Sequence, residues 1–342
     1  MLKRLGRLGL AALTLATTPL LADDGTSQAR ERWHQAIEQR YGVLADASER
    51  LEASADRFCR QPDASHRQRL TRNWLDAYQA WQAVRFVDFG PIEQQSRAWQ
   101  FQFWPDRKNL VGRKMQAWLT ADQPPSAEQI ADDSVAAQGF PALEYLLFDE
   151  SMQDAEALAS PVACGLLRAI TTHLADGTSA LQRDWQRFGE HYRGTASYTG
   201  ATLHGALLAL ETLEAKRLGD PMGLTGGPAN GYLAEAWRSG QSIRLIEGTL
   251  HGLEDTFLPG LKVLLARRGE AALADDFRET LDHARRRAAE MSPGVAPALD
   301  DDTAAFGELQ GLHVQIGQLR YRLEEIGGVL GLVRGFNASD GD

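Results

Sequence analysis

The sequence LQGLHVQIGQLRYRLEEIGGVL covers residues 309–330 and carries the clearest structural pattern in the chain. Its large apolar side chains recur at steps of three and four residues, which is the period of an amphipathic α-helix. The spacing predicts one long helix whose apolar seam packs against other helices. The seam consists of Leu309, Leu312, Ile316, Leu319, Leu323, Ile326 and Leu330.

Helical periodicity also dominates the rest of the chain, and alternating strand patterns are nearly absent. A second helix is predicted to end at the Phe-Gly-Pro turn of residues 89–91, and a third at residues 218–221. With about nine or ten helices, we predict an all-α protein of two adjoining helical-bundle halves, residues 23–165 and 166–342. The stepping residues of the two helices are Leu70, Trp74, Tyr78, Trp81 and Arg85, and Leu203, Leu207, Leu210 and Leu213.

The first 22 residues have the layout of a secretory signal peptide. Three basic residues precede an apolar stretch at residues 8–15. We expect cleavage after Ala22, with Ala16 as the alternative, and export to the periplasm or cell surface. The apolar run is shorter than the roughly 20 residues that cross a bilayer. Later apolar runs are interrupted by charge, so no transmembrane segment is expected after cleavage.

The charge balance is acidic. The chain has a formal charge of -10, and without residues 1–22 it keeps 33 basic against 46 acidic residues, a net of -13. Such a surface makes nucleic acid and anionic membranes poor partners. Cations, basic proteins and neutral ligands remain possible binding partners for such a surface.

Two cysteines, Cys59 and Cys164, are the only ones in the sequence. In an oxidising compartment an isolated pair favours a disulfide over a zinc site, because tetrahedral zinc needs two further ligands. The alternative is two buried free thiols.

Several catalytic and cofactor motifs are absent from the sequence: HExxH, CxxCH, GxSxG, the P-loop and GxGxxG in its strand context. One HxxE occurs at residues 251–254, followed by Asp255. A single copy is weak evidence for a metal site, and an exposed helix end is the alternative interpretation.

Three segments together resemble the imelysin-like family over most of the chain after residue 22. The first begins with AWQAVR at 80–85, continues through FGPI at 89–92 and ends with FWPDR at 103–107. The second, GFPALEYLLF at 139–148, is similar to the family's GxHxxE motif and the aromatic-Leu-Leu run that follows it. The third covers residues 216–253, where a Gly/Pro-rich loop precedes a helix that enters a Gly-Leu turn.

This resemblance implies an all-α fold of two bundle-like halves, with the GxHxxE segment near their junction. Family members are exported bacterial proteins linked with iron or haem acquisition. The founding member was described as a metallopeptidase. Relatives of this kind are therefore either binding proteins or enzymes.

The chain departs from the motif at Pro141, which stands at the His position. A histidine three residues before a glutamate places both side chains on one helix face, where they can share a cation. Proline offers no ligand, but it suits the first turn of a helix that starts after Gly139. Glu144 is left either as a single functional carboxylate or as a solvated or salt-bridged residue.

Tryptophans concentrate in and just before the first resembling segment, with Arg85 and Arg107 close to them in sequence. A groove of aromatic rings and guanidinium groups suits a flat or anionic ligand such as a porphyrin or an iron chelate. Alternatively, these rings fill the core between helices. The tryptophans concerned are Trp74, Trp81, Trp99 and Trp104.

We interpret the chain as a binding protein of iron or haem uptake, with iron or haem as ligand and uptake components of the cell envelope as partners. The alternatives are a metallopeptidase in which Glu144 acts with ligands distant in sequence, and a partner of a membrane uptake system without a small ligand. No residue is assigned as catalytic or as a metal ligand. The resemblance implies ligand-binding roles for Arg85, Trp104, Asp106, Arg107, Glu144 and Ser242, with the motif at Gly139, Pro141 and Glu144.

Overall fold

The computed structural model describes residues 23–300 and 303–331, so the expected signal peptide lies outside the described residues. Within these two ranges all regular structure is helical and no strand occurs, which confirms the all-α prediction. Ten of the α-helices there have ten or more residues, and four shorter ones connect them. One of the short helices is α13 (Ala296–Asp300).

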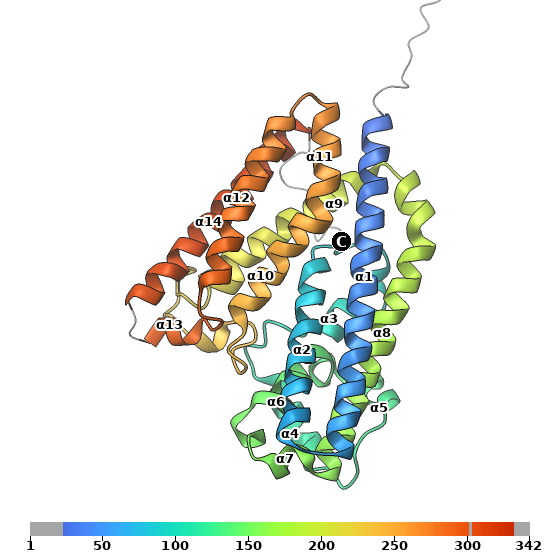
Figure 1. The fold of residues 1–342 in the computed structure, drawn as a ribbon, viewed down its shortest axis with the longest axis vertical. Coiled ribbons are helices and arrows are strands. Elements are labelled where there is room, and N and C mark those ends of the chain that lie inside the picture. The colour runs from blue at the N-terminus through green and yellow to red at the C-terminus, as the bar shows by residue number, and fades with distance from the viewer. Residues whose placement is uncertain (1–22, 301–302, 332–342) are drawn as a thin grey trace, which may run out of the picture.

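Three long helices form the frame of the first half, and α1 packs against both of the others. In Figure 1 these three run along the long axis of the molecule, with α4 to α7 gathered near one end. The long helices are α1 (Asp23–Arg60), α2 (Ala64–Val84) and α8 (Pro161–Gly194). The shorter elements are η1 (Gly90–Ser96), α3 (Arg97–Phe101), α4 (Leu110–Leu119), α5 (Ala127–Asp132), η2 (Val135–Ala137), α6 (Gly139–Phe148), η3 (Glu150–Met152) and α7 (Ala155–Ala159).

The second half is a slanted group of helices beside this frame, in which α14 packs against α12 and α9 (Figure 1). Two of its elements are π-helical, η4 and η6. Its elements are α9 (Ser197–Glu211), η4 (Thr212–Gly219), η5 (Gly231–Leu233), α10 (Ser242–Gly252), η6 (Leu253–Phe257), α11 (Leu258–Arg267), α12 (Ala271–Glu290) and α14 (Thr303–Val329).

The apolar seam predicted near the end of the chain lies along α14. Six of its seven residues, Leu309 to Ile326, are buried, and Leu330 is partly buried. The four apolar residues predicted on the second helix are buried along α2 as well. These seams belong to one continuous core that extends through both halves.

The two halves meet where α10 packs on α2 and α11 packs on α1. Gly252 makes the first contact close, because a Cβ there would lie 1.9 Å from the backbone oxygen of Ala83. The halves described here divide after α8, whereas the predicted division near residue 165 falls in the first turns of α8, which packs along α1. That division stays a prediction.

A disulfide joins Cys59, near the end of α1, to Cys164, near the start of α8, with the two Cα atoms 5.6 Å apart. This confirms the predicted bridge, and the alternative of two free thiols is wrong. None of the helices in the described ranges has both the length and the apolar character needed to cross a membrane.

Candidate functional site

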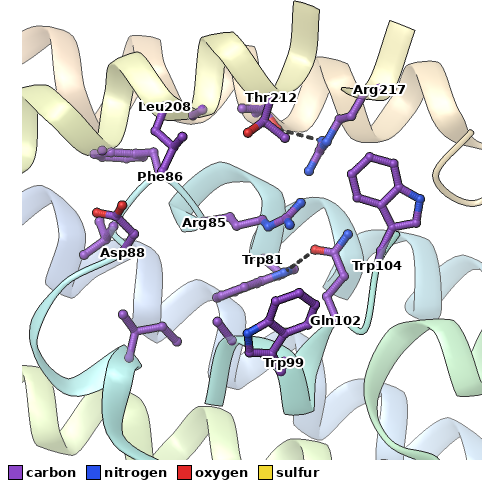
Figure 2. A pocket seen from close by; sticks show the side chains of 16 residues that line it. Trp81, Arg85, Phe86, Asp88, Trp99, Gln102, Trp104, Leu208, Thr212 and Arg217 are labelled. Carbon is purple, nitrogen blue, oxygen red and sulfur yellow. Dashed lines mark hydrogen bonds between the residues drawn. The ribbon is translucent and has the colours of Figure 1, made fainter. Parts of the chain in front are cut away.

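A cavity of about 400 Å³ lies between the last turn of α2 and the helices α9, η4 and α10 (Figure 2). The first half contributes the end of α2, the chain that follows it, and α3. The second half contributes one side of α9, two residues of η4 and one residue of α10. The cavity is lined by Trp81, Arg85, Phe86, Val87, Asp88, Ile92, Ala98, Trp99, Gln102, Trp104, Gly205, Leu208, Ala209, Thr212, Arg217 and Thr249.

Three tryptophans supply aromatic surface to this cavity. Trp81 is buried, and its Nε1 donates to Gln102 Oε1 over 2.7 Å. Trp99 is 48% exposed, which is unusual for so large an apolar side chain. Trp104 lies 6.0 Å from the guanidinium carbon of Arg217, measured to the ring centroid. Trp99 is exposed, Trp104 is half-buried and both line the cavity, so their rings can meet a ligand, whereas Trp81 is fixed in the wall.

Two arginines reach the cavity from different halves of the protein. Arg85 is the C-cap of α2, and Arg217 belongs to the π-helix η4, whose extra residue per turn changes the direction of its side chains. Burial lowers the pKa of Arg217 to about 10. The guanidinium of Arg217 therefore stays charged at neutral pH.

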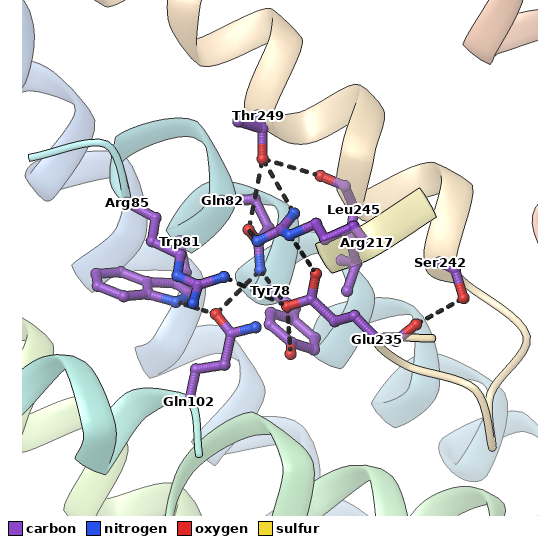
Figure 3. A network of polar contacts seen from close by, with 10 residues as sticks. All are labelled: Tyr78, Trp81, Gln82, Arg85, Gln102, Arg217, Glu235, Ser242, Leu245 and Thr249. Atoms are coloured by element: carbon purple, nitrogen blue, oxygen red, sulfur yellow. Dashed lines mark hydrogen bonds and ion pairs between the residues drawn. The ribbon is translucent and has the colours of Figure 1, made fainter. Parts of the chain in front are cut away.

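The buried carboxylate of Glu235 lies close to both arginines (Figure 3). Arg217 Nε is 3.0 Å from Glu235 Oε2, and Arg85 Nη1 is 3.7 Å from Glu235 Oε1. Tyr78 also donates its hydroxyl to Glu235 Oε1 over 3.1 Å, and burial raises the pKa of Tyr78 well above its ordinary value. One carboxylate therefore serves two guanidinium groups and a neutral phenol.

Two glutamines extend this network to the cavity wall. Gln82 Nε2 donates to Glu235 Oε1 over 3.0 Å and to Gln102 Oε1 over 3.2 Å. Because Trp81 Nε1 also points at Gln102, both neighbours of the Gln102 amide are donors, and its oxygen must face them. The Gln102 amide nitrogen has no hydrogen-bond partner among the described residues.

The motif segment lies in α6, whose Phe140 stacks on Tyr78 of this network. Gly139 has a φ of +68°, and a Cβ there would lie 2.1 Å from the backbone oxygen of Phe101. Glycine is therefore required at this position for steric reasons. Pro141 lies in the first turn of α6, as the sequence predicts. The steric features of the motif are present although its histidine is absent.

Glu144 is buried, so it is not the solvated residue that one interpretation of the sequence favoured. Its Oε1 accepts two hydrogen bonds from Ser239, one from the backbone N–H at 2.8 Å and one from the hydroxyl at 2.9 Å. Burial raises the pKa of Glu144 to about 7, against the opposing effects of the Ser239 hydrogen bonds and the charge of Arg238. This carboxylate ties α6 in the first half to the segment before α10 in the second.

The side chains around Glu144 do not fit a catalytic metal ion. One of its oxygens is bonded to Ser239, and the charged neighbour Arg238 repels cations. In the described part of the chain, three ligand-type side chains with atoms within 4.8 Å of one another occur at His251, Glu254 and Asp255. There, both carboxylates form ion pairs with arginines, Glu254 with Arg285 and Asp255 with Arg40.

The six predicted ligand-binding residues fall into three pairs. Arg85 and Trp104 line the cavity. Glu144 does not line the cavity and bonds to Ser239, and Ser242 donates to the backbone oxygen of Glu235 over 2.6 Å. Asp106 accepts hydrogen bonds from the backbone of Leu110 and Val111 at the start of α4, and Arg107 forms an exposed ion pair with Asp220 at 2.8 Å.

The sequence interpretation missed the other polar residues of this region: Gln82, Gln102, Arg217, Glu235 and Ser239. Gln82 carried a usable signal, because it is an amide next to the apolar stripe of the second predicted helix. Arg217 and Glu235 are separated by the Gly/Pro-rich loop, and no spacing pattern connects them. Their pairing is visible only in the folded chain.

Comparison with known proteins points to one family. The family model described as Imelysin matches residues 37–321. A search of curated protein sequences returned no match. The fold is similar to the crystal structure of an imelysin-like protein from Psychrobacter arcticum 273-4, with a TM-score of 0.81, 22% identity, and coverage of 92% of this chain and 98% of that one.

A second solved structure, from Parabacteroides distasonis ATCC 8503, is provisionally described as an iron-regulated protein A precursor. Its TM-score is 0.63 at 14% identity, and the match covers 90% of this chain and 97% of that one. At such low identities these two likenesses concern the fold alone.

Proposed function

Because this chain belongs to the imelysin family, we propose that it is an exported binding protein that takes a flat or anionic ligand of iron or haem uptake into the cavity between its halves. The observation that carries the proposal is the lining of that cavity, where Trp99 and Trp104 offer ring faces and Arg85 and Arg217 offer positive charge. Ring faces hold planar ligands, and guanidinium groups hold anionic ones. A ferric chelate or a porphyrin combines both properties.

The link with iron is supported by the family resemblance and by the description of the Parabacteroides distasonis protein. Export to the periplasm is supported by the basic and apolar pattern of residues 1–22. In that compartment the partners would be uptake components of the cell envelope, and the ligand would be cargo and not a resident cofactor.

A binding role is favoured over a peptidase role by the surroundings of Glu144. A catalytic zinc ion usually has three protein ligands and one open position. Here residue 141 is a proline, Ser239 donates twice to Glu144, and Arg238 lies close to it. This set of groups holds a carboxylate in place and does not attract a cation.

Titration of the purified protein with hemin and with ferric citrate tests the binding proposal, with tryptophan fluorescence as the readout. We expect saturable quenching by at least one of these ligands at micromolar concentration, weakened in Trp104→Ala. The matched control is Trp237→Ala, because Trp237 packs on Tyr232 and Arg238 and does not line the cavity. Absence of saturable quenching by both ligands would contradict the proposal.

Proteolysis of casein tests the enzyme alternative. We expect no cleavage that responds to zinc or to a chelator, and no difference between the unchanged protein and Glu144→Gln. A chelator-sensitive activity that disappears in Glu144→Gln would show that the peptidase interpretation is right.

A further inference from the structure

We propose that the cavity selects its ligand through a carboxylate group, which binds the guanidinium of Arg85 and the amide nitrogen of Gln102. This inference rests on the proposed function for the position of the site. It adds the chemical group that the site recognises, and each of the two residues has one buried nitrogen without a hydrogen-bond acceptor in the part of the chain that the structure describes.

The amide of Gln102 is the first observation. The residue is 2% exposed and lines the cavity, and its Nε2 has no acceptor among the described residues. The amide cannot be reversed to solve this, because Trp81 and Gln82 both donate to its oxygen. In the view of Figure 2 the amide lies between Arg85 and Trp104. Buried donors without acceptors are rare and costly, so a ligand atom is the natural acceptor.

The guanidinium of Arg85 is the second observation. Its Nη1 is buried and makes no hydrogen bond in the described structure. The Glu235 oxygen 3.7 Å away is too distant for one, and that oxygen already accepts from Tyr78 and Gln82. The other oxygen of Glu235 lies 3.0 Å from Arg217 Nε as an ion pair, without the geometry of a hydrogen bond. One carboxylate therefore faces two arginines, and a second carboxylate on a ligand would complete the set.

The remaining charges of the cavity favour a group with a single negative charge. Asp88 also lines the cavity and lies beside Phe86, away from Gln102, in Figure 2. Burial raises the pKa of Asp88. The nearby charge of Glu93 adds to this rise, and His204 opposes it. Glu235 already offsets one of the two positive charges of Arg85 and Arg217, so a phosphate dianion would bring more negative charge than the cavity wall compensates. Trp99 and Trp104 supply the surface for a flat apolar body attached to the carboxylate.

A pair of probes with the same body isolates this contact: 2-naphthoate, which carries the carboxylate, and 2-naphthamide, which is neutral. Calorimetric titration should show that 2-naphthoate binds about tenfold more tightly, the usual effect of hydrogen bonds to a charged group. Arg85→Gln should remove this preference. Arg322→Gln removes the same charge outside the cavity and should keep it, because Arg322 lies on α14 and pairs with Glu325.

Gln102→Glu provides a second variant of almost the same shape. Its carboxylate can still accept from Trp81 and Gln82, but it presents an acceptor where the amide presents a donor. We expect 2-naphthamide to bind more tightly than 2-naphthoate in this variant, and thermal unfolding checks that it folds. Equal affinity of the two probes for the unchanged protein, no binding of either probe, or a preference that survives Arg85→Gln would overturn the inference.

The hemin and ferric citrate titration separates this inference from the proposed function. A carboxylate preference without hemin or ferric citrate binding would support the inference and contradict the iron or haem role. Binding of hemin or ferric citrate without a carboxylate preference would support the iron or haem role and contradict the inference.

Discussion

Two buried polar regions lie between the halves of this protein, and they differ in whether the described residues leave a buried donor without an acceptor. In the motif region, Glu144 receives two hydrogen bonds from Ser239 and is closed to other partners on that oxygen. In the cavity region, Gln102 and Arg85 keep buried donors that have no acceptor among residues 23–300 and 303–331. We infer that the motif region holds the halves together, whereas the cavity region is built for an additional group.

Arg217→Met should have the largest effect, because it leaves the buried Glu235 without its closest cation. Removing one partner of a buried ion pair costs about 3–5 kcal/mol, and urea unfolding should show a loss of that size. Arg107→Met is the control, since an exposed pair contributes about 0–1 kcal/mol. If Arg217→Met lost less than Arg107→Met, the cavity network would not be the buried structural unit described here.

Glu144→Gln should change the pH dependence of stability in the motif region. Burial raises the pKa of Glu144 from 4.5 to about 7, so the folded protein binds this proton more readily than the unfolded chain between these values. Stability therefore falls as pH rises from about 4.5 to about 7, and glutamine removes that loss. Relative to the unchanged protein, we expect little difference at pH 4.5 and a gain of roughly 2–3 kcal/mol at pH 8.

Urea unfolding at the two pH values measures this difference, with Glu128→Gln on the exposed surface of α5 as the control. A gain for Glu144→Gln that is the same at both pH values would mean that Glu144 does not titrate in this window.

Trp99→Ala should have a smaller effect, confined to ligand binding. The side chain is 48% exposed, so its loss should change stability by less than about 0.5 kcal/mol. Hemin affinity should fall about threefold to tenfold if the ring stacks on the ligand. Tyr232→Ala, which removes another exposed ring outside the cavity, should leave the affinity unchanged. An equal loss in both variants would argue against stacking in the cavity.

Pro141→His should have the smallest effect of these substitutions, and the property measured is the metal content of the protein. It restores the family histidine, but Ser239 still occupies one oxygen of Glu144 and Arg238 still opposes a cation. We expect no stoichiometric zinc or iron by metal analysis, as in the matched variant Pro141→Ala. One tightly held ion in the histidine variant alone would show that the motif region is not closed.

Much of the fold could be predicted from the sequence because local periodicity reports which helix face is buried. This periodicity predicts the buried leucine seam of α14 and the buried aromatic stripe of α2. The presence of only two cysteines in the sequence predicts the disulfide between them. The site was harder, because Arg217 and Glu235 meet only when η4 and the segment before α10 pack together. The resemblance implies a ligand-binding role for Asp106, yet its carboxylate accepts hydrogen bonds from the backbone at the start of α4.

The most direct test of the central claim is to locate bound iron in crystals grown with ferric citrate, from diffraction data collected at the iron absorption edge. Our account predicts an anomalous peak in the cavity between Trp99 and Trp104, on the side of Arg85. A peak beside Pro141 and Glu144, with the cavity empty, would contradict it.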